Sequence, residues 1–506
     1  MEITLLIFLS SGLFLGWSLG ANDASNVFGT AVASRMIKFT TAAIICSVFV
    51  VLGAVISGAG AAHGLGKLGQ LNALGGAFMA ALSAALTVYA MTRASLPVST
   101  TQAVVGAIIG WNWFSGSITD TAALTKILAT WVACPLLGAL FGAVIYKTMT
   151  YVIDRTRVHV LSLDSYTRLG LILAGAFGSY SLGANNIGNV MGVFVPSSPF
   201  TEVSIGGWVT LTSVQQLFFF GALAICVGVF TYSKRVMMTV GSGVVPLNPV
   251  GAWVVVISHS IVLFLFSSLT LEHFLASKGL PTIPLIPVSS SQAVIGAVIG
   301  IGLLKGGKAI RWRALGSIAS GWVTTPIVAS LICFVMLFVL QNVFNQVVYH
   351  KVYYELSEPA IAYLREGGMP PAGLASVAGE RIEGGVAFRD RLRAQTELPR
   401  ALEDKVIETA RLFPMRITQE GVAQVDAAYI APAQLEAVKA LIGKTFHYRW
   451  QLQEALAALE PEWKLLPNTK VNKSLNKHLK EQLEYICSVF HVEQADPEAP
   501  PMSIRR

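Results

Sequence analysis

The first 350 residues of the chain are built from one unit that occurs twice. Residues 18–32, SLGANDASNVFGTAV, and residues 181–195, SLGANNIGNVMGVFV, are identical at nine of fifteen positions. Residues 97–111, PVSTTQAVVGAIIGW, and residues 287–301, PVSSSQAVIGAVIGI, are identical at ten, and four more positions exchange only Ser with Thr or Val with Ile. An internal repeat of this kind predicts a fold of two similar structural units, each carrying the same motifs at equivalent positions.

Composition places both copies in a lipid bilayer. Of the 506 residues 54% are hydrophobic and 13% are charged, and the mean hydropathy is +0.61. Residues 1–350 hold only 16 of the 36 Lys and Arg and 7 of the 28 Asp and Glu, so charge is concentrated in residues 351–506. We predict a membrane-embedded body followed by a water-soluble tail. The net charge of +8 belongs to loops between spans, so it indicates membrane topology and predicts no nucleic-acid partner.

The two copies show the same order of apolar runs. The runs are 3–34, 40–62, 71–92, 98–113 and 121–150 in the first copy, and 168–196, 208–232, 249–275, 287–304 and 314–348 in the second. A membrane crossing needs about 20 apolar residues. The short runs therefore predict re-entrant half-helices, and the longest runs predict broken or paired helices. Together the runs predict about ten to twelve crossings. Basic residues cluster at 147–168 and 305–313, which predicts that both loops are cytoplasmic and that the repeats are inverted.

These features predict the fold class and the domains. We expect an all-α polytopic bundle of two inverted repeats, residues 1–165 and 166–350, with broken helices and re-entrant half-helices. Residues 351–506 are expected to form a small soluble helical domain, joined through the Gly- and Pro-rich EGGMPPAG. Its apolar residues recur at helical spacing, as in Leu475, Leu479, Leu483 and Ile486. We expect this domain to regulate the membrane body or to mediate assembly, since its sequence shows no catalytic motif.

The polar block GAN-D/N-x-x-N interrupts an apolar run in each copy. It supplies Asn22, Asp23 and Asn26 in the first copy and Asn185, Asn186 and Asn189 in the second. Gly, Asn and Asp weaken a helix, and broken backbone at membrane depth is tolerated only where it is buried in protein or lines a cavity. The alternative is a packing kink satisfied by its own Asn side chains. Asp23 is the one carboxylate within such a motif, and intramembrane carboxylates are functional candidates.

The second block predicts a helix start in each copy. Pro97 precedes Ser99, Thr100, Thr101 and Gln102, and Pro287 precedes Ser289, Ser290, Ser291 and Gln292. Ser followed three residues later by Gln is a capping pattern, and hydroxyls with unpaired N–H groups at the positive end of a helix dipole can hold an anion. The alternative is Ser and Thr bonding back to carbonyls within an ordinary span. His63, His259 and His273 lack metal-ligand partners at suitable spacing, so we expect structural roles for them.

Together GANDASN with GANNIGN and PVSTTQA with PVSSSQA resemble the paired signatures of the inorganic phosphate transporter (PiT) family of secondary carriers, over about residues 1–345. The resemblance implies one phosphate bound by Asn22, Asp23, Asn26, Ser99, Thr100, Thr101, Asn185, Asn186, Asn189, Ser289, Ser290 and Ser291. It implies coupling to Na⁺ or H⁺. We expect this coupling to involve Asp23, Asn22, Asn185, Gln102 and Gln292, with Asp23 as the best ligand for Na⁺ and the best proton carrier. The chain departs from the family pattern at Asn186, usually Asp, at Gln102 and Gln292, usually His, and near Val50, usually Glu.

The predicted function is therefore cation-coupled symport of inorganic phosphate with Na⁺ or H⁺, without enzymatic activity and with no cofactor besides the coupling ion. A sulfate permease of the same fold, an anion sensor signalling through the tail and an intramembrane hydrolase using Ser99 or Ser289 stay as alternatives. The hydrolase would need a base near its serine, and neither block contains one. Phosphate or sulfate and the bilayer of a plasma or bacterial inner membrane are the expected partners, and a homodimer stays open.

Overall fold

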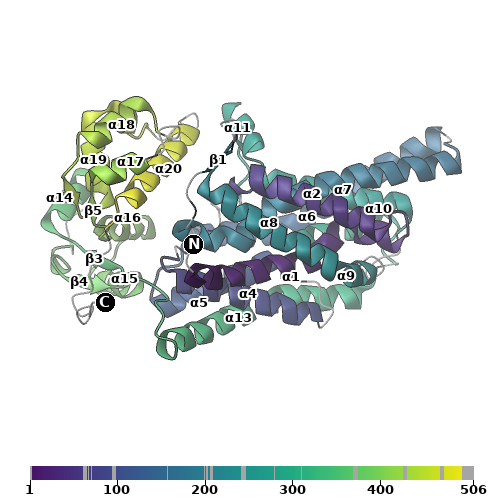
Figure 1. Ribbon diagram of the computed structural model, residues 1–506, viewed down its shortest axis with the longest axis horizontal. Helices are drawn as coiled ribbons and strands as arrows, with labels where there is room; N and C mark the ends of the chain where they lie inside the picture. The colour runs from purple at the N-terminus through teal and green to yellow at the C-terminus, as the bar shows by residue number, and fades with distance from the viewer. Residues whose placement is uncertain are drawn as a thin grey trace. The chain divides into compact units, whose positions relative to one another are not determined.

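The computed structural model describes residues 3–60, 65, 68–69, 71–93, 98–156, 158–198, 200, 203–205, 209–240, 247–278, 280–308, 310–368, 374–425, 430–467 and 472–492. The chain divides into two compact units. The first contains Met1–Phe274 and Thr282–His350, and the second contains Leu275–Pro281 and Lys351–Arg506 (Figure 1). Pro97, His63 and part of the EGGMPPAG segment lie outside the described residues.

The first unit is a bundle of long helices with matching elements from the two copies. The first copy forms α1 (Ile3–Ala33), α2 (Phe39–Ser57), α4 (Leu74–Arg93), α5 (Thr100–Ser115) and α6 (Thr121–Thr156). The second forms α7 (Val160–Met191), α8 (Ser213–Thr231), α10 (Pro249–Ser267), α12 (Ser290–Leu304) and α13 (Trp312–Asn342). Shorter elements of the second copy are η1 (Gly192–Ser197), β1 (Val203–Ile205), β2 (Val209–Leu211), α9 (Ser233–Val240) and α11 (Leu269–Ser277).

The helices of the bundle have the length and apolar composition of membrane-spanning helices. Seven helices within the described residues are long and apolar enough to cross a bilayer: α2, α4, α6, α8, α10, α13 and the helix from Val160 to Val195. The all-α membrane fold is therefore confirmed. The described residues hold fewer such helices than the predicted ten to twelve. The longest apolar runs form single helices such as the 36-residue α6, and α5 and α12, of 16 and 15 residues, are too short to cross. The expected repeat boundary at 165/166 falls inside α7.

The helices are not broken at the GAN motifs, so this part of the prediction was wrong. Both α1, of 31 residues, and α7, of 32, continue through the motif. The glycines serve close helix packing instead. A Cβ on Gly20 would overlap the carbonyl oxygen of Ile225 in α8, and a Cβ on Gly183 would overlap that of Val50 in α2. The cost of glycine in these helices is thus offset by contact between backbones.

These contacts reveal a pseudo-two-fold relation between the copies. Positions 20 and 183 are equivalent in the repeat, so α1 packs on α8 as α7 packs on α2. The space beside Gly12 is filled by Phe194 and Met191, and the space beside Gly175, its equivalent, is filled by Phe28. The early part of α1 thus meets the late part of α7, and the reverse holds as well. Equivalent helices α1 and α7 therefore run antiparallel.

The short helices α5 and α12 pack in the same reciprocal way. Gly106 of α5 lies against the backbone of Pro326 in α13, and its equivalent Gly296 of α12 lies against the backbone of Pro135 in α6. The long helix α13 of the second copy therefore packs against the short helix α5 of the first, and the long helix α6 of the first copy packs against the short helix α12 of the second. Both short helices are buried along most of their length, and their first residues lie in the interior of the bundle.

The second unit is mainly helical and contains two antiparallel strand pairs that the helical prediction did not include. Its helices are α14 (Glu358–Glu366), η2 (Leu374–Ser376), α15 (Gly385–Gln395), α16 (Arg400–Ala410), α17 (Gln419–Gln424), α18 (Pro432–Lys439), α19 (Arg449–Leu459), η3 (Pro461–Trp463) and α20 (Lys473–Val489). Its strands are β3 (Tyr353–Glu355) with β4 (Arg381–Glu383) and β5 (Met415–Arg416) with β6 (Thr445–Phe446). Of the α20 series, Leu479, Leu483 and Ile486 are buried, and Leu475 is exposed.

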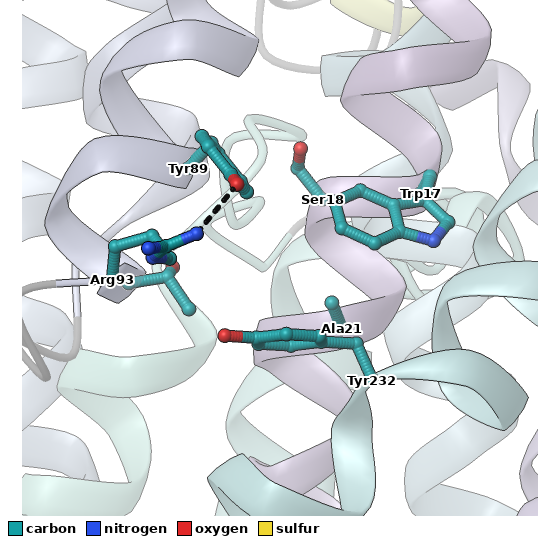
Figure 2. A pocket seen from close by; sticks show the side chains of 7 residues that line it. Trp17, Ser18, Ala21, Tyr89, Arg93 and Tyr232 are labelled. Atoms are coloured by element: carbon teal, nitrogen blue, oxygen red, sulfur yellow. Dashed lines mark hydrogen bonds between the residues drawn. The ribbon is translucent and has the colours of Figure 1, made fainter.

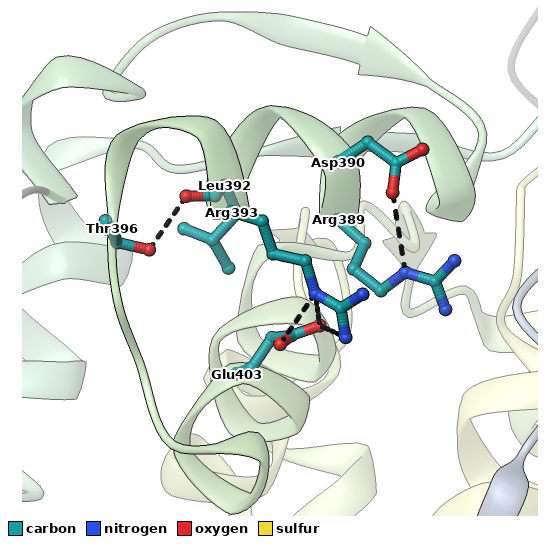
Figure 3. Close-up of polar contacts among 6 residues, drawn as sticks. All are labelled: Arg389, Asp390, Leu392, Arg393, Thr396 and Glu403. Carbon is teal, nitrogen blue, oxygen red and sulfur yellow. Dashed lines mark hydrogen bonds and ion pairs between the residues drawn. The ribbon is translucent and has the colours of Figure 1, made fainter.

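An ion pair joins two of these helices. Arg393 of α15 donates from Nε to both carboxylate oxygens of Glu403 in α16, each at 3.0 Å, and Figure 3 shows this pairing. The Glu403 side chain is only 7% exposed, so its charge requires a partner. The same contact raises the pKa of the Arg393 guanidinium.

Candidate functional site

The two GAN motifs meet in the interior of the first unit. Nδ2 of Asn186 donates to Oδ2 of Asp23 across 3.2 Å. Oδ1 of Asn186 accepts hydrogen bonds from its neighbours Asn185, at 2.8 Å, and Asn189, at 3.1 Å. All four residues are buried. One carboxylate therefore lies at the point where equivalent positions of the two copies come together.

A second pair of contacts ties each motif to the chain just before a short helix. Nδ2 of Asn185 donates to the carbonyl of Val288 at 2.8 Å, and the backbone N–H of Val288 donates to Oδ1 of Asn185 at 3.0 Å. In the first copy Nδ2 of Asn22 approaches the carbonyl of Val98 at 3.5 Å. The equivalent asparagines thus hold equivalent segments, more loosely in the first copy.

Further contacts cross from one copy to the other. Asn26 of the first copy donates to Oγ of Ser290 at 3.0 Å, and Asn189 of the second donates to Oγ1 of Thr101 at 2.9 Å. Two hydroxyls also donate across the copies: Thr101 donates to the carbonyl of Val288, and Ser291 donates to the carbonyl of Val98. The structure therefore brings the two motifs and the two helix starts into one buried cluster.

The predicted caps are present at both short helices. Oγ of Ser99 accepts from the N–H of Gln102, and Oγ of Ser289 accepts from that of Gln292, each at 3.3 Å. The reciprocal half of a capping box is not made, because Oε1 of each Gln is buried without a hydrogen-bond partner in the described residues. The glutamine side chains leave these acceptors unpaired inside the cluster.

The contacts can be compared with the alternatives given for each block. The asparagine side chains do not only satisfy their own helices. Asn22 and Asn185 reach the carbonyl just before the short helix of their own copy. Asn26 and Asn189 reach a hydroxyl on the short helix of the other copy. The hydroxyls of Thr101 and Ser291 bond to carbonyls, but these carbonyls belong to the other copy. Both blocks therefore take part in contacts that join the two copies in one buried cluster.

Several polar atoms in the cluster are buried without a hydrogen-bond partner within the described part of the chain. They are Oδ1 of Asp23, Oγ1 of Thr100, Oε1 of Gln102 and Gln292, Oδ1 of Asn189 and Nδ1 of His259. Burying a polar atom without a partner costs free energy, so a set of them in one cluster is typical of a site that receives a polar ligand. The Thr100 hydroxyl in this set can donate to an anion, while the carboxylate and amide oxygens can bind a cation or accept from a proton donor.

Sequence reasoning missed one member of this cluster. His259 on α10 is fully buried, and its Nε2 lies 2.9 Å from Oγ of Ser290. The expectation of a structural role rested on the absence of nearby metal ligands in the sequence. Ser290 is 31 residues further along, so no local spacing could reveal the contact. Within the described residues no group of three or more His, Cys, Asp or Glu could hold a metal ion.

A small cavity of about 10 Å³ is lined by residues of α1 and α4 and by Tyr232, and its volume is close to the space that one water molecule needs (Figure 2). Arg93 stands at its edge and donates to the Tyr89 hydroxyl at 3.1 Å. Ser18, which is one helical turn before Asn22, also lines it, and its Oγ is buried without a partner in the described residues. Sequence reasoning gave none of these residues a role.

Comparison with known proteins identifies the class. The model of the Phosphate transporter family matches residues 19–333 and 279–361, so the chain belongs to this family. Both GAN motifs and both helix starts fall within the matched range. The resemblance that the motifs indicated is thus confirmed, and the chain is a membrane protein of a transporter family.

Individual relatives agree with this assignment. A protein of Methanocaldococcus jannaschii named "Putative phosphate permease" is 26% identical over 337 residues, which are 66% of this chain and 98% of that protein. A Helicobacter pylori protein of the same name is 27% identical over 384 residues, 60% of this chain and 69% of that one. A solved structure titled "The sodium-dependent phosphate transporter" matches with a TM-score of 0.52 at 21% identity, covering 67% of this chain and 99% of that chain, and shows the shared fold.

Proposed function

We propose that the chain is a secondary active transporter that moves inorganic phosphate across a cell membrane together with a cation. The observation that carries the proposal is the cross-copy pair Asn26–Ser290 and Asn189–Thr101. It joins both helix starts to both motifs at one buried place. A site formed equally by two antiparallel halves suits alternating access, in which one half moves against the other around a bound substrate.

The anion is held by neutral donors in this proposal. The helix starts supply backbone N–H groups and hydroxyls, and the side chains of the cluster include no Lys or Arg. Hydroxyls and N–H groups at a helix N-terminus bind an oxyanion through the helix dipole and through hydrogen bonds. Thr100 is the clearest ligand, because its Oγ1 is buried and has no partner in the described residues.

Asp23 supports phosphate over sulfate and provides the coupling. Phosphate near neutral pH retains a proton that it can donate to a carboxylate, whereas sulfate retains none and would be repelled. The unpartnered Oδ1 of Asp23 is also an oxygen that a Na⁺ ion or a proton can take. Asn22 and Asn185, with Oε1 of Gln102 and Gln292, are the further oxygens that we assign to cation coupling.

Uptake of radiolabelled phosphate into proteoliposomes tests the proposal. We expect accumulation against a gradient that depends on imposed Na⁺ or on an inward proton gradient, and weak competition by sulfate. Separate gradients of the two cations identify the coupling ion. Preference for sulfate would overturn the substrate assignment, and phosphate binding without flux would favour a sensor.

The contact between His259 and Ser290 is the one that a hydrolase would need, with Ser290 as the nucleophile and His259 as its base. Activated serines usually have a base that a third group orients, but Nδ1 of His259 has no partner in the described residues. A fluorophosphonate probe tests this alternative directly. We expect no labelling of Ser290, and labelling that a His259→Gln variant loses would support the hydrolase.

A further inference from the structure

The imidazole of His259 contacts the proposed phosphate site through one nitrogen only. Its Nε2 lies 2.9 Å from Oγ of Ser290, the first residue of α12. The same oxygen accepts the hydrogen bond from Asn26. Nδ1, the other ring nitrogen, is buried and has no hydrogen-bond partner in the described residues. A titratable group therefore touches an anion ligand while one of its own protonation sites stays unused.

The pseudo-two-fold relation is broken at this histidine. Gly76 of α4 and Gly251 of α10 occupy equivalent positions, each followed by Ala, which aligns Ala84 with His259. The first copy thus contributes a carboxylate, Asp23, on α1. The second copy lacks the equivalent carboxylate and contributes an imidazole from α10 instead.

Few other ionisable groups lie near His259. The helices that pack on α10 are α1, α6, α7 and α12. Helix α12 contains no ionisable side chain, and α1 contains only Asp23. On α6 the buried ionisable group is Cys134, whose Sγ donates to the carbonyl of Ser289 at 3.3 Å.

The other charged residues of α6 and α7 are exposed, and they are Lys126, Lys147, Asp154, Arg155, Asp164 and Arg168. Tyr180 of α7 is only partly buried, and its hydroxyl bonds to Ser57 at 2.7 Å. On the described parts of these four helices, the buried ionisable groups are thus one carboxylate, Asp23, and one thiol, Cys134.

The protonation state of His259 determines what Ser290 can offer an anion. With a proton on Nε2, the ring donates to Oγ, which already accepts from Asn26, so the hydroxyl hydrogen is available for a ligand. With Nε2 unprotonated, the hydroxyl hydrogen is directed to the ring and withdrawn from the ligand. A second proton on Nδ1 fixes the first arrangement, because both nitrogens are then donors, and it adds a positive charge beside the anion.

We propose that His259 is a proton-binding residue of the carrier, whose protonation at Nδ1 favours anion binding through Ser290. This inference rests on the proposed function. Linkage then requires that anion binding draws a proton onto His259, and that anion affinity falls as the pH rises through the titration of this histidine. Release of the anion on the other side of the membrane returns the proton to water.

Calorimetry on the full-length protein in detergent tests the proposal. Inorganic phosphate is titrated into wild type and His259→Gln from about pH 5.5 to about pH 8.5, on both sides of the ordinary histidine pKa. Two buffers of different ionisation enthalpy give the number of protons taken up per phosphate. The contribution of phosphate itself is the same in both proteins. His273→Gln, which changes an exposed imidazole on α11, is the matched control.

We expect wild type and H273Q to take up as much as one proton more per phosphate than H259Q. The phosphate affinity of wild type and of H273Q should therefore fall more steeply with rising pH than that of H259Q, by as much as an additional tenfold per pH unit. A merely structural histidine would lower affinity equally at every pH, so equal slopes and equal proton numbers in H259Q and wild type would overturn the proposal.

If H259Q does not insert, Ser290→Ala keeps the imidazole and removes the link to the anion. The extra proton uptake should then disappear, and its full retention in S290A would also overturn the proposal. Absence of phosphate binding by wild type would instead refute the proposed function.

Discussion

Asn186 donates a hydrogen bond to Asp23 across 3.2 Å, although the two residues are 163 positions apart and occupy the same position of the repeat. Contact between equivalent residues places them at the pseudo-two-fold axis. The difference between Asp and Asn is therefore a difference between the two halves at their shared centre. The amide pairs with one carboxylate oxygen and leaves Oδ1 without a partner in the described residues.

The first prediction concerns Asp23→Asn. Asparagine has nearly the same shape, so folding should be preserved, but it cannot carry a proton and is a weaker cation ligand. We expect concentrative phosphate uptake to be abolished while equilibrium exchange of phosphate persists. Radiolabel accumulation in proteoliposomes with and without a cation gradient measures both.

Asp120→Asn is the matched control for this substitution. Asp120 caps α6 through its Oδ1, which accepts from the N–H groups of Ala122 and Ala123, and asparagine is an equally good cap. Uptake by this variant should equal that of wild type. If Asp23→Asn still concentrated phosphate against its gradient, the coupling role of Asp23 would be wrong.

The second prediction concerns Asn186→Asp, which makes the two halves alike at the axis. Two carboxylates within about 3 Å cannot both be ionised without a compensating charge, so the variant needs an additional cation or proton. We expect phosphate uptake to depend more steeply on the coupling ion, with about one more cation moved per phosphate. Parallel measurement of labelled phosphate and cation flux gives the stoichiometry, and an unchanged ratio would count against a cation at the axis.

The third prediction concerns Thr100→Val, which replaces a hydroxyl by a methyl group of similar size. Oγ1 of Thr100 has no partner in the described residues, so stability should change little. A hydrogen bond to a charged partner contributes about 1.5 to 3 kcal/mol, so phosphate affinity should fall at least about tenfold.

Thr87→Val is the control for Thr100→Val. Thr87 is also buried, on α4, and its hydroxyl donates only to the carbonyl of Ser83 in its own helix. Binding by this variant should match wild type. Equal affinity of Thr100→Val and wild type in a calorimetric titration would remove Thr100 from the anion site.

Sequence periodicity and the repeat were enough to predict a helical membrane bundle and the capped starts of α5 and α12. The candidate cluster was expected from the family resemblance of the motifs. The course of the helices through the GAN motifs could not be predicted in this way. Glycine and asparagine weaken an isolated helix, but in this fold Gly20 and Gly183 allow backbone contact that only the packed structure contains. His259 was missed for a related reason, because its partner Ser290 lies on another helix.

The fourth prediction concerns these packing glycines. Gly20→Ala would place a Cβ against the backbone carbonyl of Ile225, which a side-chain rotation cannot relieve. Overpacking of this kind costs about 1 to 3 kcal/mol, so the thermal midpoint measured by fluorescence-detected size exclusion should fall. Gly316→Ala on α13 is the control, because a Cβ there meets nothing within 4 Å. An unchanged midpoint for Gly20→Ala would refute the close approach of α1 and α8.

The last prediction concerns removal of the tail. The polar contacts that complete the first unit extend to His350, because Trp111 donates to the carbonyl of Val348 at 3.0 Å and Asn72 exchanges hydrogen bonds with the backbone of His350. All residues of the proposed site precede this point.

A chain ending after His350 should therefore insert, bind phosphate with wild-type affinity and retain flux. Trp111→Phe keeps an aromatic ring but loses the N–H donor, and it should lower the thermal midpoint of the truncated and the full chain alike. If the truncated protein is monodisperse and yet binds no phosphate, residues 351–506 contribute to the site and the division into body and tail is wrong. If it binds phosphate but moves none, the tail is needed for the transport cycle.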